Sequence, residues 1–304
     1  MTKKPVFDIA VIGGGPAGLS AALTGRIRNK QVALFEHRSF SQKLQKAHTV
    51  ENYLGLPELS GQEMMRQFAD HCLKHQPTLI KEKVMNIFPG NEMFTLLTPD
   101  ATYEAKTIIL TTGVTSAVLL GGERELLGRG VSYCATCDGM LYRGRDVAVI
   151  SYTPEGESEA DYLSEICLNV HYLPQYKETP CVNDKVEVLH SKPLEVVGKQ
   201  TVDELITDKG TLKVDGVFIL RHSDPVENIL PGLELGAGDV ILVKRDMATN
   251  IPGVFAAGDC TGKPWQIAKA TGEGLVAVFS AIQYLDQQSR KTADGASDKI
   301  QKNV

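Results

Sequence analysis

The sequence lacks the features that mark membrane, secreted or nucleic-acid-binding proteins. No apolar run reaches the roughly 20 residues that a membrane-spanning helix needs. The opening residues lead straight into an apolar strand and contain no apolar signal core. The net charge of −5 argues against nucleic acid as the main partner. We therefore expect a cytoplasmic protein that binds neither a membrane nor a nucleic acid.

Cysteine is sparse, with six in 304 residues, and two of them stand together. Cys134 and Cys137 belong to a Cys-Ala-Thr-Cys motif that Asp138 follows at once. A structural zinc site would need a second ligand pair, which the other cysteines do not form, so we expect no metal. Two thiols at this spacing can close a small disulfide, and the neighbouring carboxyl can supply or take a proton. The motif therefore predicts two-electron exchange through sulfur.

The N-terminal segment has the pattern of a dinucleotide-binding unit. Residues 7–12 form an apolar strand, residues 13–18 a Gly-Gly-Gly-Pro-Ala-Gly turn, and residues 19–29 a helix. A second apolar strand, residues 31–36, ends in an acid. This order of strand, glycine turn, helix, strand and acid predicts a site for a dinucleotide.

Each glycine of this turn has a physical task. Gly13 makes the tight turn, Gly15 lets the backbone approach a pyrophosphate, and Gly18 lets the helix pack closely on the strand. The N–H groups at the helix start then face the phosphate charge. Glu36 suits a pair of ribose hydroxyls and repels a 2′-phosphate. The candidate residues of this unit are Gly13, Gly15, Pro16, Ala17, Gly18 and Glu36.

Two later segments belong with the same predicted domain. Residues 106–113 are typical of a strand that ends in small residues, and residues 253–260 of a strand that ends at Asp259. Asp259 could hydrogen-bond a hydroxyl near a ribityl or pyrophosphate group. A helix is expected from residue 266 to about residue 285, followed by a polar tail.

Over nearly its full length the chain resembles the low-molecular-weight thioredoxin reductases. The resemblance rests on the glycine turn, Glu-Asn-Tyr-Leu-Gly at 51–55, the Thr-Thr-Gly strand end, Cys-Ala-Thr-Cys-Asp-Gly, and the segment 258–274. It implies an α/β fold of two Rossmann-like three-layer domains, FAD, a homodimer and thioredoxin as substrate. One departure is Ser-Gln-Lys-Leu at 41–44, where Gly-Gly-Gln-Leu is usual. The cofactor-binding residues implied beyond the glycine turn and Glu36 are Lys43, Leu44, Asn52, Thr112, Gly113, Gly258, Asp259, Gln266 and Ile267.

The resemblance also implies how the domains and the dithiol are arranged. Residues 1–113 and 248–304 would form the FAD-binding domain, with a flexible tail from about residue 286. Residues 114–247 would form a smaller inserted domain that carries the CxxC. Within that motif, Cys137 would face the flavin and Cys134 would attack the disulfide of the partner. Asp138 would exchange the proton of the leaving thiolate.

The inserted domain lacks the second glycine turn that the family uses for NADPH. After the strand at 146–150, residues 151–160 read Ser-Tyr-Thr-Pro-Glu-Gly-Glu-Ser-Glu-Ala, with a single glycine. Tyrosine and proline obstruct a close backbone approach, and three glutamates repel a pyrophosphate. The arginines that would hold a 2′-phosphate are also missing, because none occurs between Arg145 and Arg221.

The sequence thus keeps the predicted flavin site and the dithiol but not the nicotinamide site. We expect a donor such as reduced ferredoxin, as in the ferredoxin-dependent flavin thioredoxin reductases. FAD accepts electrons singly or in pairs, so it can join a one-electron iron–sulfur donor to a two-electron disulfide. Three alternatives stay open: a reduced deazaflavin (F420H2) donor, NAD(P)H at a diverged site, and a flavin-binding redox sensor without turnover. The intact CxxC and its acid oppose the sensor.

Overall fold

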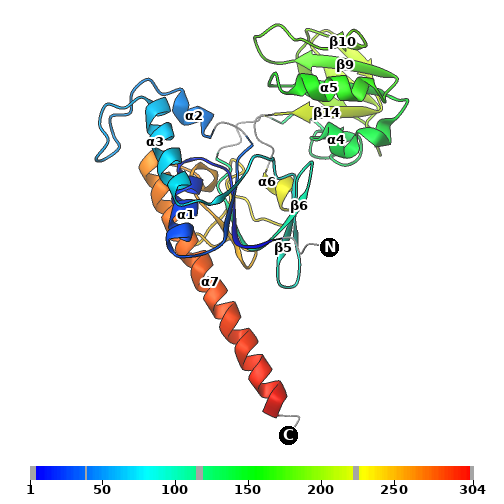
Figure 1. The fold of residues 1–304 in the computed structure, drawn as a ribbon. Helices are drawn as coiled ribbons and strands as arrows, with labels where there is room; N and C mark the ends of the chain where they lie inside the picture. Colours follow the sequence, from blue (N-terminus) through cyan, green and yellow to red (C-terminus); the bar gives the residue numbers. More distant parts are fainter. Residues whose placement is uncertain (1–4, 38–39, 114–118, 222–225, 302–304) are drawn as a thin grey trace. The chain divides into compact units, whose positions relative to one another are not determined.

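The structure is a computed structural model of the chain, and it describes the backbone of residues 5–37, 40–113, 119–221 and 226–301. The chain divides into two compact units (Figure 1). One comprises residues 1–115 and 225–304, and the other residues 116–224. Within the described ranges, none of the helices combines the length and the apolar character that a bilayer crossing requires.

The first unit is built on a mostly parallel, seven-stranded sheet. The strand order is β3-β2-β1-β6-β5-β4, and β15 also pairs with β6. Strands β1, β2, β3, β6 and β15 pair with one another in parallel, whereas β5 pairs antiparallel with both β6 and β4. Strands covered on both faces read as continuous apolar runs, which is why β1 and β2 were visible in the sequence. Their bounds are β1 Val6–Ile12, β2 Val32–Phe35, β3 Thr78–Ile80, β4 Asn86–Pro89, β5 Phe94–Leu97, β6 Thr102–Leu110 and β15 Val254–Ala256.

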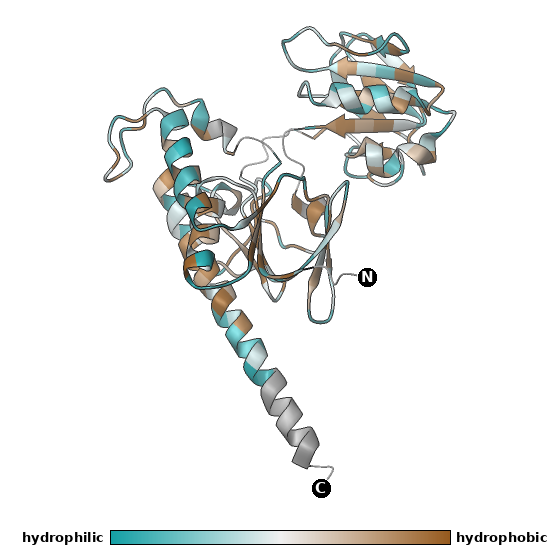
Figure 2. Ribbon diagram, viewed as in Figure 1, coloured by the Kyte–Doolittle hydropathy of each residue, from teal (hydrophilic) through white to brown (hydrophobic). Residues whose placement is uncertain are grey.

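Helices α1 (Pro16–Ile27) and α7 (Ile267–Gln301) pack against each other in this unit. Gly274 permits this contact, because a Cβ there would lie 2.1 Å from the carbonyl oxygen of Ala17. Hydrophobic residues cluster along α1 and the first turns of α7, and α7 becomes hydrophilic further on (Figure 2). The other helices of this unit are α2 Gln42–Gln45, α3 Gly61–Lys74, α6 Val226–Ile229 and the 3-10 turn η2 Asp259–Thr261.

The backbone of α7 is helical as far as Gln301, so the tail from about residue 286 continues the helix, and its flexibility stays a prediction. The segment 286–301 contains no proline, and eight of its 16 residues are alanine, lysine, glutamine or arginine, which favour helix. A polar helical stretch without an apolar face had looked like an irregular terminus.

The second unit has its own parallel sheet, in the order β10-β9-β8-β14-β7, and a small antiparallel sheet, β11-β12-β13. The prediction of an α/β fold with parallel, Rossmann-like sheets is confirmed. The strands are β7 Val131–Ser132, β8 Asp146–Ser151, β9 Asn169–Pro174, β10 Val186–Val188, β11 Pro193–Val197, β12 Glu204–Thr207, β13 Gly210–Lys213 and β14 Gly216–Leu220. The helices are α4 Ala135–Asp138, the 3-10 turn η1 Gly139–Tyr142 and α5 Gly156–Ser164.

The second unit ends at residue 224, whereas the sequence had suggested 247. The reason is apolar burial. Leu230, Leu233 and Ile241 are buried in the same core as Phe7 and Ala256 of the first unit's sheet. Residues 226–247 therefore belong with the first unit. The predicted start of the insert, residue 114, lies outside the described residues.

Candidate functional site

Four parallel strands of the first unit bring their carboxyl ends to one edge of the sheet. The register pairs Ile12 with both Phe35 and Leu110, and Leu110 with Ala256. The predicted cofactor segments follow directly after these four residues. In open parallel sheets this edge is where ligands bind. The residues that leave it are Gly13, Glu36, Thr111 and Ala257.

The glycine turn forms a cradle that side chains would fill. Gly13 has φ +111°, and a Cβ there would lie 2.5 Å from the carbonyl oxygen of Thr111. A Cβ at Gly18 would lie 1.9 Å from the carbonyl oxygen of Gly13. A Cβ at Gly15, in contrast, would have only ordinary contacts, because its nearest neighbour, Cβ of Ser41, would be 4.0 Å away. The turn is thus closed toward the sheet and open at the start of α1, which fits an approaching pyrophosphate.

Glu36 lies against this turn. The backbone N–H of Gly14 donates to Glu36 Oε2 over 2.8 Å, and Glu36 is 9% exposed. The carboxylate therefore stands beside the turn, where we predicted that it would meet ribose hydroxyls.

Two further predicted residues meet at the start of α7. Asn52 Nδ2 donates to Gln266 Oε1 over 2.8 Å, and Ile267 is the first residue of the helix. Leu44 is buried in the core that includes α1 and α3. The side chain of Lys43 lies outside the described part of the chain.

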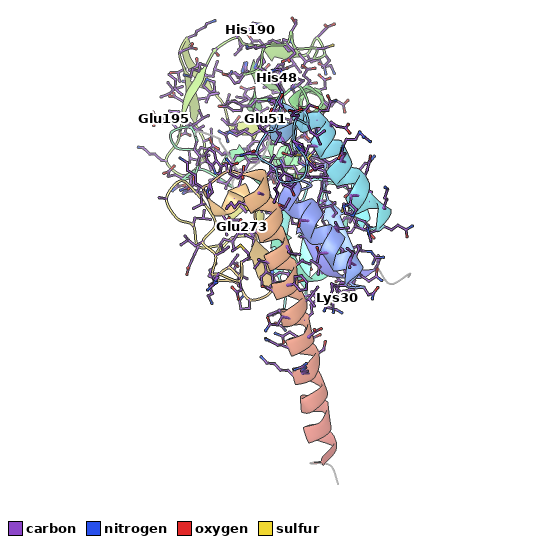
Figure 3. All side chains as sticks on the ribbon, turned by 90° about the vertical axis from the view of Figure 1, so that its left-hand side faces the viewer. Lys30, His48, Glu51, His190, Glu195 and Glu273 are labelled. Carbon is purple, nitrogen blue, oxygen red and sulfur yellow. A yellow bond between two sulfur atoms is a disulfide. The ribbon has the colours of Figure 1, made fainter. Side chains whose placement is uncertain are left out.

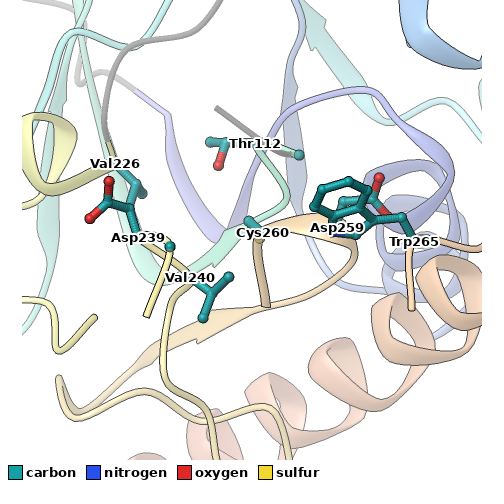
Figure 4. Close-up of a pocket in the computed structure, with 9 residues that line it drawn as sticks. Thr112, Val226, Asp239, Val240, Asp259, Cys260 and Trp265 are labelled. Carbon is teal, nitrogen blue, oxygen red and sulfur yellow. The ribbon is translucent and has the colours of Figure 1, made fainter. Parts of the chain in front are cut away.

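A small pocket of about 40 Å³, partly open to solvent, lies beside these segments. Of the predicted residues, Thr112, Gly113 and Asp259 line it (Figure 4). The sequence did not point to Trp265, the chain's single tryptophan, although it directly precedes Gln266. The remaining lining residues, also not predicted as cofactor contacts, are Val226, Gly238, Asp239, Val240 and Cys260.

A lysine and a glutamate on α7 hold the turn that carries Asp259. Lys269 Nζ donates to the carbonyl oxygens of Gly258 and Gly262, each over 2.8 Å. Glu273 Oε2, labelled on α7 in Figure 3, accepts the Gly258 N–H over 2.9 Å. Lys269 and Glu273 also form an ion pair at 3.1 Å. Both ends of the turn are thus fixed to one helix.

Cys260 packs in this turn and is buried. Its Sγ donates to the carbonyl oxygen of Ala257 over 3.3 Å. Burial raises the pKa of the Cys260 thiol to about 11, so the thiol stays protonated at neutral pH.

The second unit carries the dithiol at the start of α4. Cys134 and Cys137 form a disulfide, with their Cα atoms 5.3 Å apart. Cys134 precedes α4 as its cap, and its Sγ accepts the N–H of Cys137 over 3.0 Å. Cys134 is buried, with 8% exposed, whereas Cys137 is exposed. In this oxidised form the more accessible sulfur is therefore that of Cys137.

Asp138 is tied to the backbone of the dithiol through a serine that the sequence reasoning missed. Ser132 Oγ donates to Asp138 Oδ2 over 2.7 Å. The same Oγ accepts the N–H of Cys134 over 3.1 Å. Asp138 is thereby held near the sulfur whose proton it is predicted to exchange. The sequence feature that could have pointed to Ser132 is its position, two residues before the first cysteine of the motif.

A buried ion pair supports the strand that leads into the dithiol. Arg221 and Glu123 are 6% and 0% exposed, and Arg221 Nη2 donates to Glu123 Oε2 over 2.7 Å. The Tyr133 hydroxyl donates to Glu123 Oε1 over 2.8 Å. Because Tyr133 directly precedes Cys134, this hydrogen-bond network holds the chain in place just before the redox motif.

The turn after β8, where the family's second nucleotide motif would stand, is filled by its own side chains. Ser151 Oγ donates to the carbonyl oxygen of Thr153 over 2.6 Å. The Arg221 guanidinium lies over the ring of Tyr152, 5.1 Å from its centroid. Glu157 Oε1 accepts the Tyr176 hydroxyl over 2.6 Å. This turn has no glycine cradle and places acids at the start of α5.

Among the described residues, no three His, Cys, Asp or Glu side chains gather in a way that could hold a metal ion.

A parallel-sheet unit with a dinucleotide cradle, and a second unit with a CxxC disulfide, together define a disulfide oxidoreductase. The model of the family described as pyridine nucleotide-disulphide oxidoreductase matches residues 7–274, and the chain belongs to this family. Within it, the chain is a flavin disulfide oxidoreductase of the thioredoxin reductase type.

Individual relatives show which members of the family the chain resembles. It is 29% identical to the thioredoxin reductase of Bacillus subtilis, over 96% of this chain and 99% of that one. A crystal structure of a ferredoxin-flavin thioredoxin reductase from Clostridium acetobutylicum matches with a TM-score of 0.86 and 43% identity. That match covers 94% of this chain and 99% of the other. The structure of a thioredoxin reductase from Gloeobacter violaceus matches with a TM-score of 0.78 and 27% identity, covering 93% and 95%.

Proposed function

We propose that this protein is an FAD-dependent thioredoxin reductase that takes its electrons from reduced ferredoxin. The observation that carries the proposal is the contrast between the two nucleotide turns. The first has the glycine cradle beside Glu36, whereas the second is filled by Tyr152 and bordered by the acids of α5. The match to a ferredoxin-flavin thioredoxin reductase at 43% identity supports the same assignment.

The residues of the first unit fit FAD. The open side of the Gly13–Gly18 turn suits a pyrophosphate, and Glu36 suits the ribose hydroxyls. Asp259 and Thr112 line the neighbouring pocket, where the rest of the cofactor would lie. When bound, FAD accepts electrons singly or in pairs and passes them on to a disulfide. Asn52, Gln266 and Ile267 would contribute contacts from the start of α7.

The dithiol performs the exchange with thioredoxin. After reduction, the Cys134 thiolate attacks one sulfur of the partner disulfide, and the S–S bond of the partner breaks. A mixed disulfide forms, and the partner's second sulfur leaves as a thiolate that takes up a proton. Cys137 then attacks Cys134, which reforms the intramolecular disulfide and releases thioredoxin as a dithiol. Asp138, held by Ser132, exchanges the protons of these steps.

The charge of the two units differs in a way that suits an acidic donor. Of the chain's 37 acidic and 32 basic residues, 18 acidic and 11 basic residues fall within residues 116–224. The first unit is therefore the less acidic one. Ferredoxins are generally acidic, so we place their docking on the first unit, which also holds the flavin site.

From the resemblance to the thioredoxin reductases we also propose that the enzyme is a cytoplasmic homodimer. Three exposed apolar side chains on α7 support a contact with a second copy, because they lie on neighbouring positions of one helix. They are Leu275, Val276 and Phe279, each 40–44% exposed.

We expect the holoenzyme to bind neither NADPH nor NADH at micromolar strength, because the second turn offers no cradle and carries acidic side chains. Isothermal titration of the oxidised holoenzyme with each nucleotide measures this directly. Micromolar binding of NADPH, followed by rapid loss of the flavin absorbance, would contradict the proposal. The Bacillus subtilis thioredoxin reductase, titrated in parallel, shows whether the assay detects nucleotide binding in a related chain.

A further inference from the structure

The acidic side chains of α5 are used inside the second unit, and one of them reaches the dithiol. Glu159 Oε2 accepts the backbone N–H of Ala135 over 3.1 Å. Ala135 is the first residue of α4 and directly follows Cys134. The acid that replaces part of a nucleotide motif therefore lies at the start of the redox helix.

Close packing holds α4 and η1 on α5. A Cβ at Gly139 would lie 3.0 Å from Leu163 and 3.1 Å from Tyr162 of α5. Ala135, Ala160 and Leu163 are fully buried in one core. The Glu159 carboxylate is thus fixed near the dithiol by its helix as well as by its hydrogen bond.

A carboxylate at this position opposes the formation of a thiolate. The N–H groups at a helix start usually stabilise a cysteine thiolate and lower its pKa. Here Cys137 N–H points to the sulfur of Cys134, while Ala135 N–H points to Glu159. The Ala135 N–H, which could otherwise stabilise a thiolate, therefore donates its hydrogen bond to the Glu159 carboxylate.

The other charged groups around α4 do not offset this effect. Asp138 is a second carboxylate on the helix itself. On η1, burial raises the pKa of the Tyr142 phenol, and the Asp138 charge adds to that rise, while Arg145 acts in the opposite sense. The charges that act on Tyr142 are thus two carboxylates, Asp138 and Asp215, and one guanidinium, Arg145.

We propose that Glu159 is a positioning residue that holds the first turn of the redox helix and whose charge keeps the reduced dithiol in its thiol form at neutral pH. A dithiol kept as thiols reacts slowly with small oxidants, and the Cys134 thiolate that attacks thioredoxin forms when Asp138 takes the proton. The inference rests on the Cys134–Cys137 pair being the exchange site of the proposed function. It does not depend on which donor reduces the flavin.

The test is the alkylation rate of the reduced holoenzyme. The protein is reduced with tris(carboxyethyl)phosphine under nitrogen and treated with iodoacetamide at pH 7, and each cysteine peptide is quantified by mass spectrometry. Glu159→Gln keeps an acceptor for Ala135 N–H but removes the charge. We expect alkylation of the motif to become about tenfold faster, because the thiolate is the form that reacts. Cys181, which is exposed in the same unit, serves as the internal reference.

Two further variants separate charge from structure. Glu157→Gln removes an equal charge from the same helix, where the carboxylate binds Tyr176, and should leave the rate within about twofold of the wild type. Glu159→Ala should also accelerate alkylation, but with a lower melting temperature. A Glu159→Gln rate equal to the wild type, or a Glu157→Gln rate that rises as much, would overturn the proposal. Neither result would affect the thioredoxin reductase assignment, which thioredoxin turnover tests separately.

Discussion

A Cys137→Ser variant will trap thioredoxin as a stable mixed disulfide through Cys134, and a Cys134→Ser variant will trap none. Neither variant will turn over. Resolution of the adduct needs the second thiol, so its removal stops the cycle after the first exchange. Mass spectrometry of each variant, reduced and then mixed with oxidised thioredoxin, identifies the linked cysteine.

The structure makes this test informative, because Cys137 is the more exposed sulfur in the oxidised form. If exposure decided the chemistry, the adduct would form through Cys137 and only in the Cys134→Ser variant. That result would reverse the roles of the two cysteines. A variant of Cys181, the exposed cysteine outside the motif, is the matched control and should turn over as the wild type does, without a stable adduct.

Breaking the buried ion pair will have the largest effect on stability. Arg221→Met leaves the fully buried carboxylate of Glu123 without its charged partner, and such a change costs about 3–5 kcal/mol. We expect the loss in the free energy of opening of β8 and β14, measured by amide hydrogen exchange. β14 ends one residue before Arg221, and Tyr152, which Arg221 covers, follows β8.

An exposed ion pair of the same chain provides the control. Arg66 pairs with Glu63 at 2.6 Å, with side chains 61% and 37% exposed, and Arg66→Met should leave the stability nearly unchanged, because water screens this pair. The double variant Glu123→Gln with Arg221→Met should recover part of the loss, because no charge is then left buried. Equal and small losses for Arg221→Met and Arg66→Met would show that the buried pair contributes no more than a surface one.

The sequence predicted best where a local pattern determines the structure. The Gly13–Gly18 turn could be identified because its glycines stand between two apolar strands, and Glu36 because it ends the second strand. The CxxC was equally clear, since its spacing permits the disulfide. In each case the residues that matter are neighbours along the chain or occupy a known unit of about 30 residues.

The unpredicted parts depend on contacts between distant segments. The domain end at residue 224 follows from Leu230 and Ile241 packing into the first unit's core, which no local pattern reveals. Trp265 lines the pocket because the loop before α7 returns to the strand ends. Glu159 had been interpreted as a residue that repels phosphate, and its bond to Ala135 became visible only once α4 and α5 lay together.

The electron donor is the central claim, and an anaerobic stopped-flow experiment tests it most directly. The oxidised holoenzyme is mixed with reduced ferredoxin, NADPH, NADH or reduced F420, each with oxidised thioredoxin present. The flavin absorbance and the appearance of thioredoxin thiols are followed together. Our account predicts that reduced ferredoxin bleaches the flavin and yields reduced thioredoxin, while neither nicotinamide does so at a comparable rate. Fast reduction of both flavin and thioredoxin by NADPH, with none by ferredoxin, would contradict it.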